Sequence, residues 1–513
     1  MADLSFRPSG RPAPAGHRDA WVDAAVLSAL WLEARALGGD VVTVGMGPKR
    51  ARARAASLAR RLPTRVPVVV AGVAGGLAPG LNTGDVVVAN ELLTADGRPP
   101  RPVLGADLLA AELRRAGLRV QTGPIVSSPS LAWSPPARAR LARTGALAVD
   151  MESAYVADQL TGHPLAVVRT ISDTAGDGVL LGGPRALRSL RRARGPIDAW
   201  TRAIGSKEIV LAAPRSFCAG VERAIEIVER ALERFGSPVF VRRQIVHNTH
   251  VVRRLESLGA IFVQELSEVP DGAAVVLAAH GVSPEVRNEA HERGTLRVID
   301  ATCPLVAKVH HEARRYLAQD YRMVLIGHPE HEEVAGTLGE APDRIRLVQH
   351  VDEVGVLPYG PDDRVAYLTQ TTLATDETAE IVDALRSRYP SVVGPHANDI
   401  CYATQNRQDA VRSLAALCDL VLVVGSANSS NAARLVEVAR REGRRAELVE
   451  DDSELRLGWF DGARRIGLTA GASAPESLVD QVLDALGTLG PITIDEHRTT
   501  EETVRFSLPQ QVR

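Results

Sequence analysis

The chain has 513 residues, a formal net charge of -2, 45% hydrophobic residues and 24% charged residues. This length exceeds one ordinary hydrophobic core, so it predicts two or more domains, and the composition is typical of a globular protein. The near-neutral charge argues against nucleic acid or an anionic membrane surface as the main partner. Lys49, Lys207 and Lys308 are the only lysines, and the many arginines are expected along exposed helical faces.

The first residues and the cysteines bear on location. Residues 1–19 are polar and lack the apolar core of a secretory signal, and apolar runs such as Leu420–Val424 are too short to span a bilayer. Four cysteines in so long a chain do not make a disulfide framework. A cytoplasmic, reducing location is therefore expected.

Short β-branched segments alternate with Ala/Arg/Leu-rich helical segments in both halves of the chain. This alternation predicts α/β folds in which helices cross over between parallel strands. We expect a disordered tail over 1–17, one α/β domain over 18–204, a second over 207–489 and a polar tail over 490–513. The best candidate for a linker is 194–206.

In the second domain, apolar strands repeatedly run into a small or polar turn followed by a helix. The strand Ile209–Ala213 leads to Cys218, and the strand Arg297–Ile299 leads to Cys303, with Pro304 suited to the first helical position. Cys401 lies at or near a third such turn. Ligands of α/β proteins bind at these carboxyl ends of strands, so the turns are the expected place of the site.

Cys218, Cys303 and Cys401 are 85 and 98 residues apart, unlike the close ligand pairs of zinc ribbons and fingers. A helix N-terminus favours thiolate over thiol, as metal ligation requires. Three thiolates on a four-iron cluster would leave one iron without a protein ligand. The alternative is three unrelated cysteines, and Cys418, inside an apolar run, is expected to be a buried structural residue.

Other polar residues at the strand ends suit an anion. Imidazoles, hydroxyls, amides and helix N-termini can hold phosphate oxygens without a lysine. The candidates are His247, His280, His331, Thr372, Ser429, Asn431 and Ser473. Any one of these histidines could instead be an ordinary turn residue. No Gly-Lys-Ser/Thr phosphate loop is present, and Glu333 is either a general acid or a solvated helix cap.

With these residues in place, 207–489 resembles the 4-hydroxy-3-methylbut-2-enyl diphosphate reductases of the methylerythritol phosphate isoprenoid pathway. The matching motifs are long, lie in order and cover this whole half. They are Pro-Arg-Ser-Phe-Cys218-Ala-Gly-Val, Val-His247-Asn, Ala-His280-Gly-Val, Asp-Ala-Thr-Cys303-Pro-Leu-Val, Thr-Gln-Thr371-Thr372-Leu, Asp-Ile-Cys401-Tyr, Gly-Ser-Ala-Asn-Ser429-Ser430-Asn431 and Thr-Ala-Gly-Ala-Ser473-Ala-Pro.

The resemblance implies three similar parallel-sheet α/β units around a central [4Fe–4S] cluster on Cys218, Cys303 and Cys401. It further implies that Glu333 delivers protons, that Thr371 holds the substrate hydroxyl, and that the anion pocket, with Ser430, grips the diphosphate. Two electrons and two protons would then expel water, giving isopentenyl and dimethylallyl diphosphates. A ferredoxin or flavodoxin would supply the electrons, and neither nucleic acid nor a membrane is an expected partner.

The proton-donor loop departs from the family pattern. Such loops commonly read His-Pro-Glu, and this chain contains His328-Pro329-Glu330. Counted back from Gly336-Thr337, however, the matching positions are His331 and Glu333, with Glu332 in place of the proline. We therefore predict that Glu333 and not Glu330 is the donor.

Motifs of the first half resemble nucleoside phosphorylases and nucleosidases. They are Val44-Gly-Met-Gly-Pro48, Ala71-Gly-Val-Ala-Gly-Gly76, Gly84-Asp85, Asp150-Met151-Glu152-Ser153 and Arg169-Thr-Ile-Ser-Asp173. The resemblance implies that Glu152 holds a ribose, that Asp173 protonates a purine leaving group and that Glu33 activates water. The alternative is that the glycines serve tight turns and Glu152 caps a helix.

Four functional classes follow. The main hypothesis is a reductase with an appended domain. The first domain could be a nucleoside-binding module without catalysis, or the chain could be bifunctional, with an additional purine nucleosidase or phosphorylase activity. A simple iron–sulfur electron carrier is disfavoured, because carriers usually complete all four ligands and lack an anion pocket.

Overall fold

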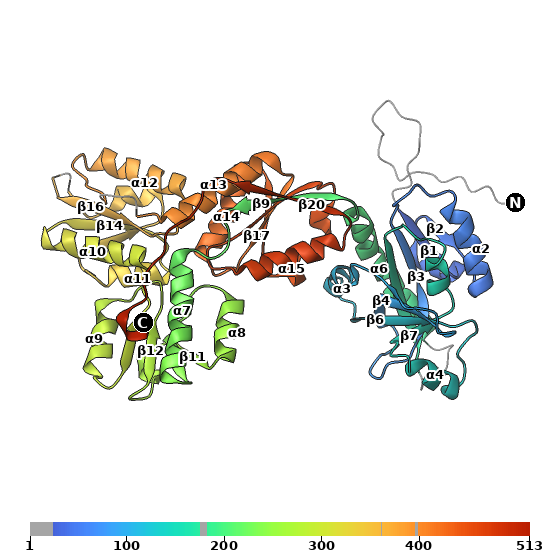
Figure 1. Cartoon of the computed structure of the whole chain (residues 1–513). Coiled ribbons are helices and arrows are strands. Elements are labelled where there is room, and N and C mark those ends of the chain that lie inside the picture. Colours follow the sequence, from blue (N-terminus) through green and yellow to red (C-terminus); the bar gives the residue numbers. More distant parts are fainter. Residues whose placement is uncertain (1–23, 175–181, 361, 396–398) are drawn as a thin grey trace, which may run out of the picture. The chain divides into compact units, whose positions relative to one another are not determined.

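The computed structural model describes residues 24–174, 182–360, 362–395 and 399–513, so the predicted disordered tail over 1–17 lies outside the described residues. Contacts divide the chain into two compact units. The first unit contains residues 1–207, 453–464 and 483–492, and the second contains 208–452, 465–482 and 493–513. Figure 1 labels the elements of both units.

The first unit is built on an eight-stranded sheet in the order β2-β1-β3-β7-β6-β4-β5, with β8 paired to both β3 and β4. Its strands are β1 (Ala25–Ser28), β2 (Val41–Thr43), β3 (Val68–Gly76), β4 (Val86–Thr94), β5 (Arg101–Pro102), β6 (Val120–Ser127), β7 (Ala148–Asp150) and β8 (Leu165–Asp173). The central strand β3 reads Val-Val-Val-Ala at its start and is fully buried there, as a strand covered on both faces requires.

The expected parallel strands form only part of the sheet of this unit. Strands β1, β2, β3 and β8 pair in parallel, whereas β3 with β7, β4 with β8 and β4 with β5 are antiparallel. The β4–β5 connection is a short turn, and a turn this short can only join antiparallel neighbours. The alternation of strands and helices does not reveal such pairs.

The helices of the first unit are α1 (Trp31–Leu37), α2 (Pro48–Ala59), α3 (Ala106–Arg115), α4 (Pro135–Ala142), α5 (Ser153–Ala157) and α6 (Gly183–Ala203). Residues 194–203 of the predicted linker form the second half of α6. Ile197 and Trp200 are fully buried there, because they continue the apolar stripe of that helix. This segment was predicted as a linker because its Arg- and Ala-rich composition makes the apolar stripe hard to recognise in the sequence.

The second unit contains three separate sheets, which confirms the predicted three α/β parts. The sheets have the orders β11-β10-β12-β13, β15-β14-β16 and β18-β17-β19-β9-β20. Their strands are β9 (Lys207–Ala213), β10 (Val239–Arg242), β11 (Ala260–Val263), β12 (Ala274–Leu277), β13 (Arg297–Asp300), β14 (Arg322–Ile326), β15 (Ile345–Val348), β16 (Val365–Thr369), β17 (Leu420–Val424), β18 (Arg445–Val449), β19 (Arg465–Ala470) and β20 (Ile492–Arg498). The first two sheets, and β18, β17, β19 and β9 of the third, are parallel.

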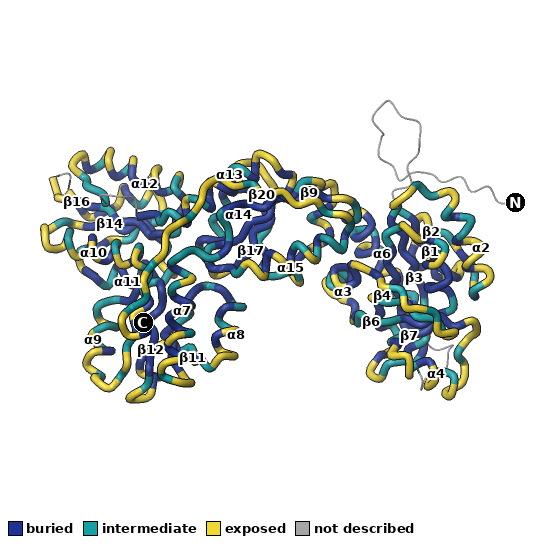
Figure 2. The backbone as a smooth tube through the Cα atoms, viewed as in Figure 1, coloured by how far each residue is buried: buried dark blue, intermediate teal, exposed yellow. Residues whose placement is uncertain are grey.

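Helices connect these parallel strands, as crossovers must. They are α7 (Ala219–Phe235), α8 (Thr249–Ser257), α9 (Pro284–Glu292), α10 (Pro304–Ala318), α11 (Glu332–Leu338), α12 (Thr375–Arg388), α13 (Tyr402–Leu417), α14 (Ser430–Arg441) and α15 (Glu476–Gly487). The second unit also has the short 3-10 helices η1 (Leu266–Glu268), η2 (Val351–Val356) and η5 (Gln510–Val512). Of the remaining two, η4 (Leu457–Phe460) belongs to the first unit, and η3 (Asp452–Glu454) spans the sequence boundary between the units. In Figure 2 the labelled strands are mostly buried, whereas the helices are partly exposed.

The C-terminal segment is held against the second unit. Thr499 donates its backbone N–H to the Ala213 carbonyl at 2.9 Å, Glu502 pairs with the fully buried Arg407 at 3.0 Å, and Val512 is buried in the core beside α7. Arg169 of the first unit is also fully buried. The expectation that arginines lie along exposed faces is wrong at Arg169 and Arg407. Among the described residues, no helix is both long and apolar enough to cross a membrane.

Candidate active sites

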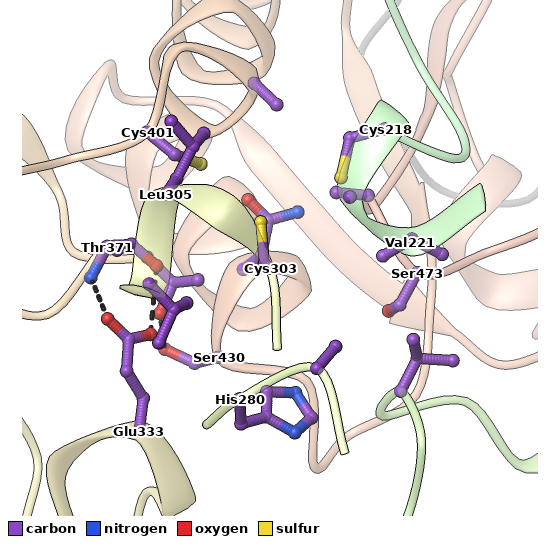
Figure 3. A pocket seen from close by; sticks show the side chains of 18 of the residues that line it. Cys218, Val221, His280, Cys303, Leu305, Glu333, Thr371, Cys401, Ser430 and Ser473 are labelled. Atoms are coloured by element: carbon purple, nitrogen blue, oxygen red, sulfur yellow. Dashed lines mark hydrogen bonds between the residues drawn. The ribbon is translucent and has the colours of Figure 1, made fainter. Parts of the chain in front are cut away.

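The predicted residues of the second unit converge on one cavity. It is lined by all thirteen: Cys218, His247, His280, Cys303, His331, Glu333, Thr371, Thr372, Cys401, Ser429, Ser430, Asn431 and Ser473. Figure 3 shows the three cysteine side chains at one end of this cavity, with Glu333 and His280 further along. The exposed Glu330 is not among the lining residues.

Each of the three cysteines is the N-cap residue of a helix. Cys218 precedes α7, Cys303 precedes α10 and Cys401 precedes α13. The positive ends of three helix dipoles therefore point at this end of the cavity, which favours bound anions and thiolates. Cys418 is instead 2% exposed in a hydrophobic core, as predicted.

The three thiols lie near one another, but they are not placed around the position of a single ion. A Cβ placed on Gly220 would lie 2.7 Å from the Cys303 sulfur and 3.8 Å from the Cys218 sulfur, so only glycine fits between them. No three Cys, His, Asp or Glu side chains within the described ranges are placed to bind a single metal ion. Three thiols around a shared space suit a group of several atoms, such as an iron–sulfur cluster, better than a lone ion.

Burial makes ionisation of the Cys303 and Cys401 thiols costly in the absence of a cation. Burial raises the pKa of Cys303 to about 12 and that of Cys401 to about 11. Neighbouring thiols add to both shifts, because two negative sulfurs repel each other. A cation that binds all three sulfurs would remove this cost, so the donor set fits iron.

Glu333 and Thr371 are joined by two hydrogen bonds on one wall of the cavity (Figure 3). The Thr371 backbone N–H donates to one carboxyl oxygen of Glu333 at 2.7 Å, and its hydroxyl donates to the other at 2.9 Å. Glu333 is only 2% exposed, and burial raises its pKa to about 7. A carboxyl group that holds a proton near neutral pH can act as a general acid.

Three histidines cluster at the other end of the cavity. The rings of His247 and His280 stack with centroids 4.1 Å apart, and His331 meets them edge-on at 5.5 and 5.7 Å. Burial lowers the pKa of His247 to about 3, and burial also holds the pKa of His331 well below its usual range. The His331 Nδ1 accepts the Glu333 backbone N–H at 3.2 Å, so the neutral ring carries its proton on Nε2.

Several polar atoms around these rings are buried without a hydrogen-bond partner among the described residues. They are both amide atoms of Asn431 and Nε2 of His247. Ser429 caps α14, and its hydroxyl lies 3.3 Å from that of Ser473. Buried polar groups are normally paired, so this set points to a polar ligand that supplies the missing partners.

Sequence reasoning missed some lining residues of this cavity. Val221, Leu305 and Tyr402 lie beside the cysteines on α7, α10 and α13, and Phe506 comes from the segment expected as a polar tail. The first three follow cysteine motifs and were within reach of the sequence. Nothing in the sequence around Phe506 marks it as part of a site.

The first unit has a cavity of its own. All three predicted residues, Glu33, Glu152 and Asp173, line it. Glu152 accepts the Gly47 backbone N–H at 2.9 Å, and burial, with Asp150 close by, raises the pKa of Glu152 to about 7. Arg138, which the sequence did not mark, also lines the cavity and pairs with Asp173.

These two cavities define an α/β protein with a three-thiol site in its second unit and an acidic pocket in its first. Residues 209–487 match the family described as LytB protein, and residues 36–182 match the Phosphorylase superfamily. The chain belongs to the LytB family, whose enzymes are iron–sulfur proteins. The predicted resemblances of both halves are confirmed.

Individual proteins similar to this chain were found for each half. The 4-hydroxy-3-methylbut-2-enyl diphosphate reductase of Cutibacterium acnes is 56% identical over 314 residues, which cover 61% of this chain and 97% of the relative. The solved E-1-hydroxy-2-methyl-but-2-enyl-4-diphosphate reductase of Plasmodium falciparum is 38% identical with a TM-score of 0.58, over 60% of this chain and 97% of that one. The solved 5'-methylthioadenosine/S-adenosyl homocysteine nucleosidase of Helicobacter pylori is 21% identical with a TM-score of 0.31. This match covers 34% of this chain and 96% of the nucleosidase.

Proposed function

We propose that the second unit reductively removes the hydroxyl group of 4-hydroxy-3-methylbut-2-enyl diphosphate, giving isopentenyl and dimethylallyl diphosphates. The carbon–oxygen bond to the hydroxyl breaks, and two electrons and two protons are consumed. One proton leaves with the hydroxyl as water, and the other ends on the carbon skeleton. The observation that carries this proposal is the single cavity that joins three thiols, the Glu333–Thr371 contact and the orphaned polar atoms.

The diphosphate would lie at the histidine end. The Nε2–H of His331 and the Asn431 amide can donate to phosphate oxygens, and the α14 N-terminus adds backbone N–H groups. Ser429, Ser430, Ser473 and Thr372 contribute hydroxyls. Neutral histidines that take up protons as the diphosphate enters would strengthen its binding, because the charges then attract.

The hydroxyl end would lie against Glu333 and Thr371. Glu333 carries a proton in a large fraction of molecules at neutral pH, because burial has raised its pKa to about 7. It can therefore protonate the departing hydroxyl, and Thr371 holds the carboxyl group in a fixed orientation. The apolar side chains of Val221, Leu305 and Phe506 would face the carbon skeleton and exclude bulk water.

Cys218, Cys303 and Cys401 would hold a [4Fe–4S] cluster with one iron free of protein ligands. When bound, the cluster supplies electrons and a Lewis acid for the substrate oxygen. A ferredoxin or flavodoxin would deliver the electrons. The proposed location is a reducing cytoplasm, in which free thiols such as these four cysteines persist.

The test is anaerobic turnover. The full chain, purified without oxygen, should contain iron and sulfide and should consume the hydroxylated diphosphate when given a reduced viologen. Glu333→Gln should reduce turnover strongly, and Glu330→Gln should leave it nearly unchanged. A colourless protein without turnover would contradict the reductase proposal.

A second function is supported for the first unit, where Glu33, Glu152 and Asp173 line one cavity. We propose that this cavity binds a purine nucleoside and cleaves its N-glycosidic bond, with Glu152 on the ribose and Asp173 at the base. The chain would then be bifunctional. Base release from nucleosides that is lost in Asp173→Asn supports catalysis, and nucleoside binding without release supports a binding module.

A further inference from the structure

The helix that follows each cavity cysteine has a positively charged side chain in its second turn. These side chains are Arg223 on α7, Lys308 on α10 and Arg407 on α13, which follow the respective cysteine by five, five and six residues. Each of them contacts the turn in front of a different cysteine. Resting on the iron–sulfur site proposed above, we propose that these three residues form a closed ring of positioning residues, which we call the cation ring. The cation ring sets the spacing of the three thiols, and its charge favours reduction of the cluster that they hold.

Arg223 links α7, which begins after Cys218, to the turn before Cys303. Its Nη1 donates to the backbone carbonyls of Ala301 and Thr302 at 3.2 and 3.1 Å. Burial lowers the pKa of Arg223, whereas an ionised Cys303 thiol raises it. The guanidinium therefore lies within electrostatic reach of that sulfur.

Lys308 makes the second link, from α10, which begins after Cys303, to the turn before Cys401. Its Nζ donates to one carboxyl oxygen of Asp399 at 3.1 Å. The Asp399 side chain is fully buried, and its other oxygen accepts the backbone N–H of Thr369, the last residue of β16, at 3.2 Å. Asp399 thus joins the turn before Cys401 to both α10 and the end of β16.

Arg407 makes the third link, from α13, which begins after Cys401, back to the turn before Cys218. It is fully buried, and its Nε and Nη2 donate to the Ser216 carbonyl at 3.2 and 2.8 Å. Ser216 has a φ of 59°, a left-handed conformation that residues other than glycine seldom adopt. Arg407 stabilises this turn, and the three links together form a closed circuit through the cysteine turns.

Two members of the cation ring also hold the C-terminal segment. Glu502 pairs with Arg407 at 3.0 Å, and the Ser507 carbonyl accepts a hydrogen bond from Nε of Arg223 at 2.9 Å. Phe506 lies between these two anchors in the sequence and lines the cavity. The same residues that position the cysteine turns therefore also fix an apolar side chain in the cavity wall, which limits the access of water.

The three residues differ in how far their charge is compensated. Arg407 pairs with Glu502, and Lys308 pairs with Asp399. Arg223 donates only to backbone carbonyls among the described residues. A cluster that gains an electron becomes more negative, and a positive charge close to it stabilises the reduced form. We therefore expect all three residues to affect how firmly iron is held, and Arg223 to have the largest effect on the reduction potential.

Iron release tests the positioning role. The full chain and its variants Arg223→Gln, Lys308→Gln and Arg407→Gln are purified without oxygen and mixed with an iron chelator, and the visible absorption is followed. Each variant should lose iron about 10-fold faster than the wild type, because residues that orient metal ligands typically contribute a factor of about 10 to 100 to metal affinity. Arg230→Gln is the matched control, since it changes an exposed arginine of α7, and it should behave as the wild type.

Conservative variants separate charge from geometry. In a redox titration followed by electron paramagnetic resonance, Arg223→Gln should have a more negative midpoint potential than the wild type, and Arg223→Lys, which keeps the charge, should restore it. Arg407→Lys also keeps the charge but lacks the planar guanidinium that reaches both Ser216 and Glu502. It should therefore lose iron as fast as Arg407→Gln. Circular dichroism checks that each variant is folded.

The outcomes separate this inference from the function on which it rests. A wild-type protein without iron contradicts the iron–sulfur site itself. An iron-bound wild type, with three glutamine variants that release iron at its rate, overturns the cation ring and leaves the site standing. An effect confined to Arg407→Gln also overturns the ring, because one buried arginine then explains it, and if that variant does not fold, Arg223 and Lys308 decide alone. An unchanged potential in Arg223→Gln overturns the role of charge.

Discussion

Thr371 donates a hydrogen bond to each carboxyl oxygen of Glu333, one from its backbone N–H at 2.7 Å and one from its hydroxyl at 2.9 Å. Thr371 follows strand β16 and Glu333 lies in the first turn of α11, so the contact joins two strand-end turns of one sheet. Both oxygens act as acceptors in this contact. The carboxyl group is therefore oriented before any substrate arrives, as a proton donor requires.

Replacing Glu333 with glutamine should lower kcat about 100-fold or more, because glutamine keeps the shape but has no proton to give. In the wild type, kcat should fall as pH rises through about 7, since the acid form of Glu333 is lost there. A pH–rate profile of both proteins measures this. A wild-type profile that stays flat between pH 6 and 8, with chemistry limiting, would contradict the assignment.

The same group should affect stability in a defined direction. Glu333 titrates near 4.5 when unfolded and near 7 when folded, so the folded state binds the extra proton between these values. The contribution of Glu333 to stability should therefore fall as pH rises from about 4.5 to 7, by roughly 3 kcal/mol. Groups such as Glu152 and His247 titrate in both proteins, so urea unfolding at several pH values should show this fall as the difference between the wild type and Glu333→Gln. An identical pH dependence of the two proteins would exclude a contribution of Glu333.

The three cluster cysteines should differ sharply from the fourth. Substituting Cys218, Cys303 or Cys401 with serine should remove most bound iron and the visible absorption, because each supplies a ligand that burial alone cannot replace. Cys418→Ala is the internal control: its side chain lies in a core, so the variant should lose some stability but keep its iron. Equal iron loss in all four variants would indicate general unfolding instead of ligand removal.

Substituting Gly220 should reduce bound iron, as substituting one of the three cysteine ligands should. A Cβ at this position would lie 2.7 Å from the Cys303 sulfur, so Gly220→Ala should displace that sulfur and reduce iron content. Gly355→Ala is the matched control, since nothing lies within 4 Å of its Cβ position. Iron and sulfide analysis of both, with circular dichroism to confirm folding, decides the point, and a normal cluster in Gly220→Ala would refute it.

Asn431 should report on the diphosphate. Both of its amide atoms are buried without partners among the described residues, whereas the exposed Asn428 bonds Gln244 at 2.9 Å. Asn431→Ala should raise KM about 10- to 100-fold, the loss of one hydrogen bond to a charged group, with a smaller change in kcat. Asn428→Ala should change neither constant, and similar effects of the two substitutions would count against a pocket centred on Asn431.

Much of this site was predictable because its chemistry sits in strand-to-helix turns. Cys218 and Cys303 follow apolar strands and precede helices, and the sequence shows both features directly. The approach of His247 to His280 follows from the rule that parallel strands of one sheet end at the same edge, because β10 and β12 belong to one sheet. His331 follows β14 of another sheet, so its place beside them does not follow from that rule. The ring stacking and the lowered pKa values of His247 and His331 do not follow either, because they depend on side-chain packing and burial.

Other features were beyond the sequence. Arg138, Arg169 and Arg407 look like the surrounding surface arginines, and only tertiary packing shows that they are buried against Asp173, Asp150 and Glu502. The antiparallel pairing of β3 with β7 leaves no periodic signal, because β7 has only three residues. Phe506 reaches the cavity because the whole C-terminal segment is anchored elsewhere.

The most direct test of the central claim is product analysis of anaerobic turnover in deuterated water. Loss of the hydroxyl with two electrons and two protons places one solvent hydrogen on carbon. Mass spectrometry should therefore find isopentenyl and dimethylallyl diphosphates that each carry one deuterium, formed by the wild type and nearly absent with Cys401→Ser. Recovery of unchanged hydroxylated diphosphate, from a wild-type protein with a full complement of iron, would contradict the account.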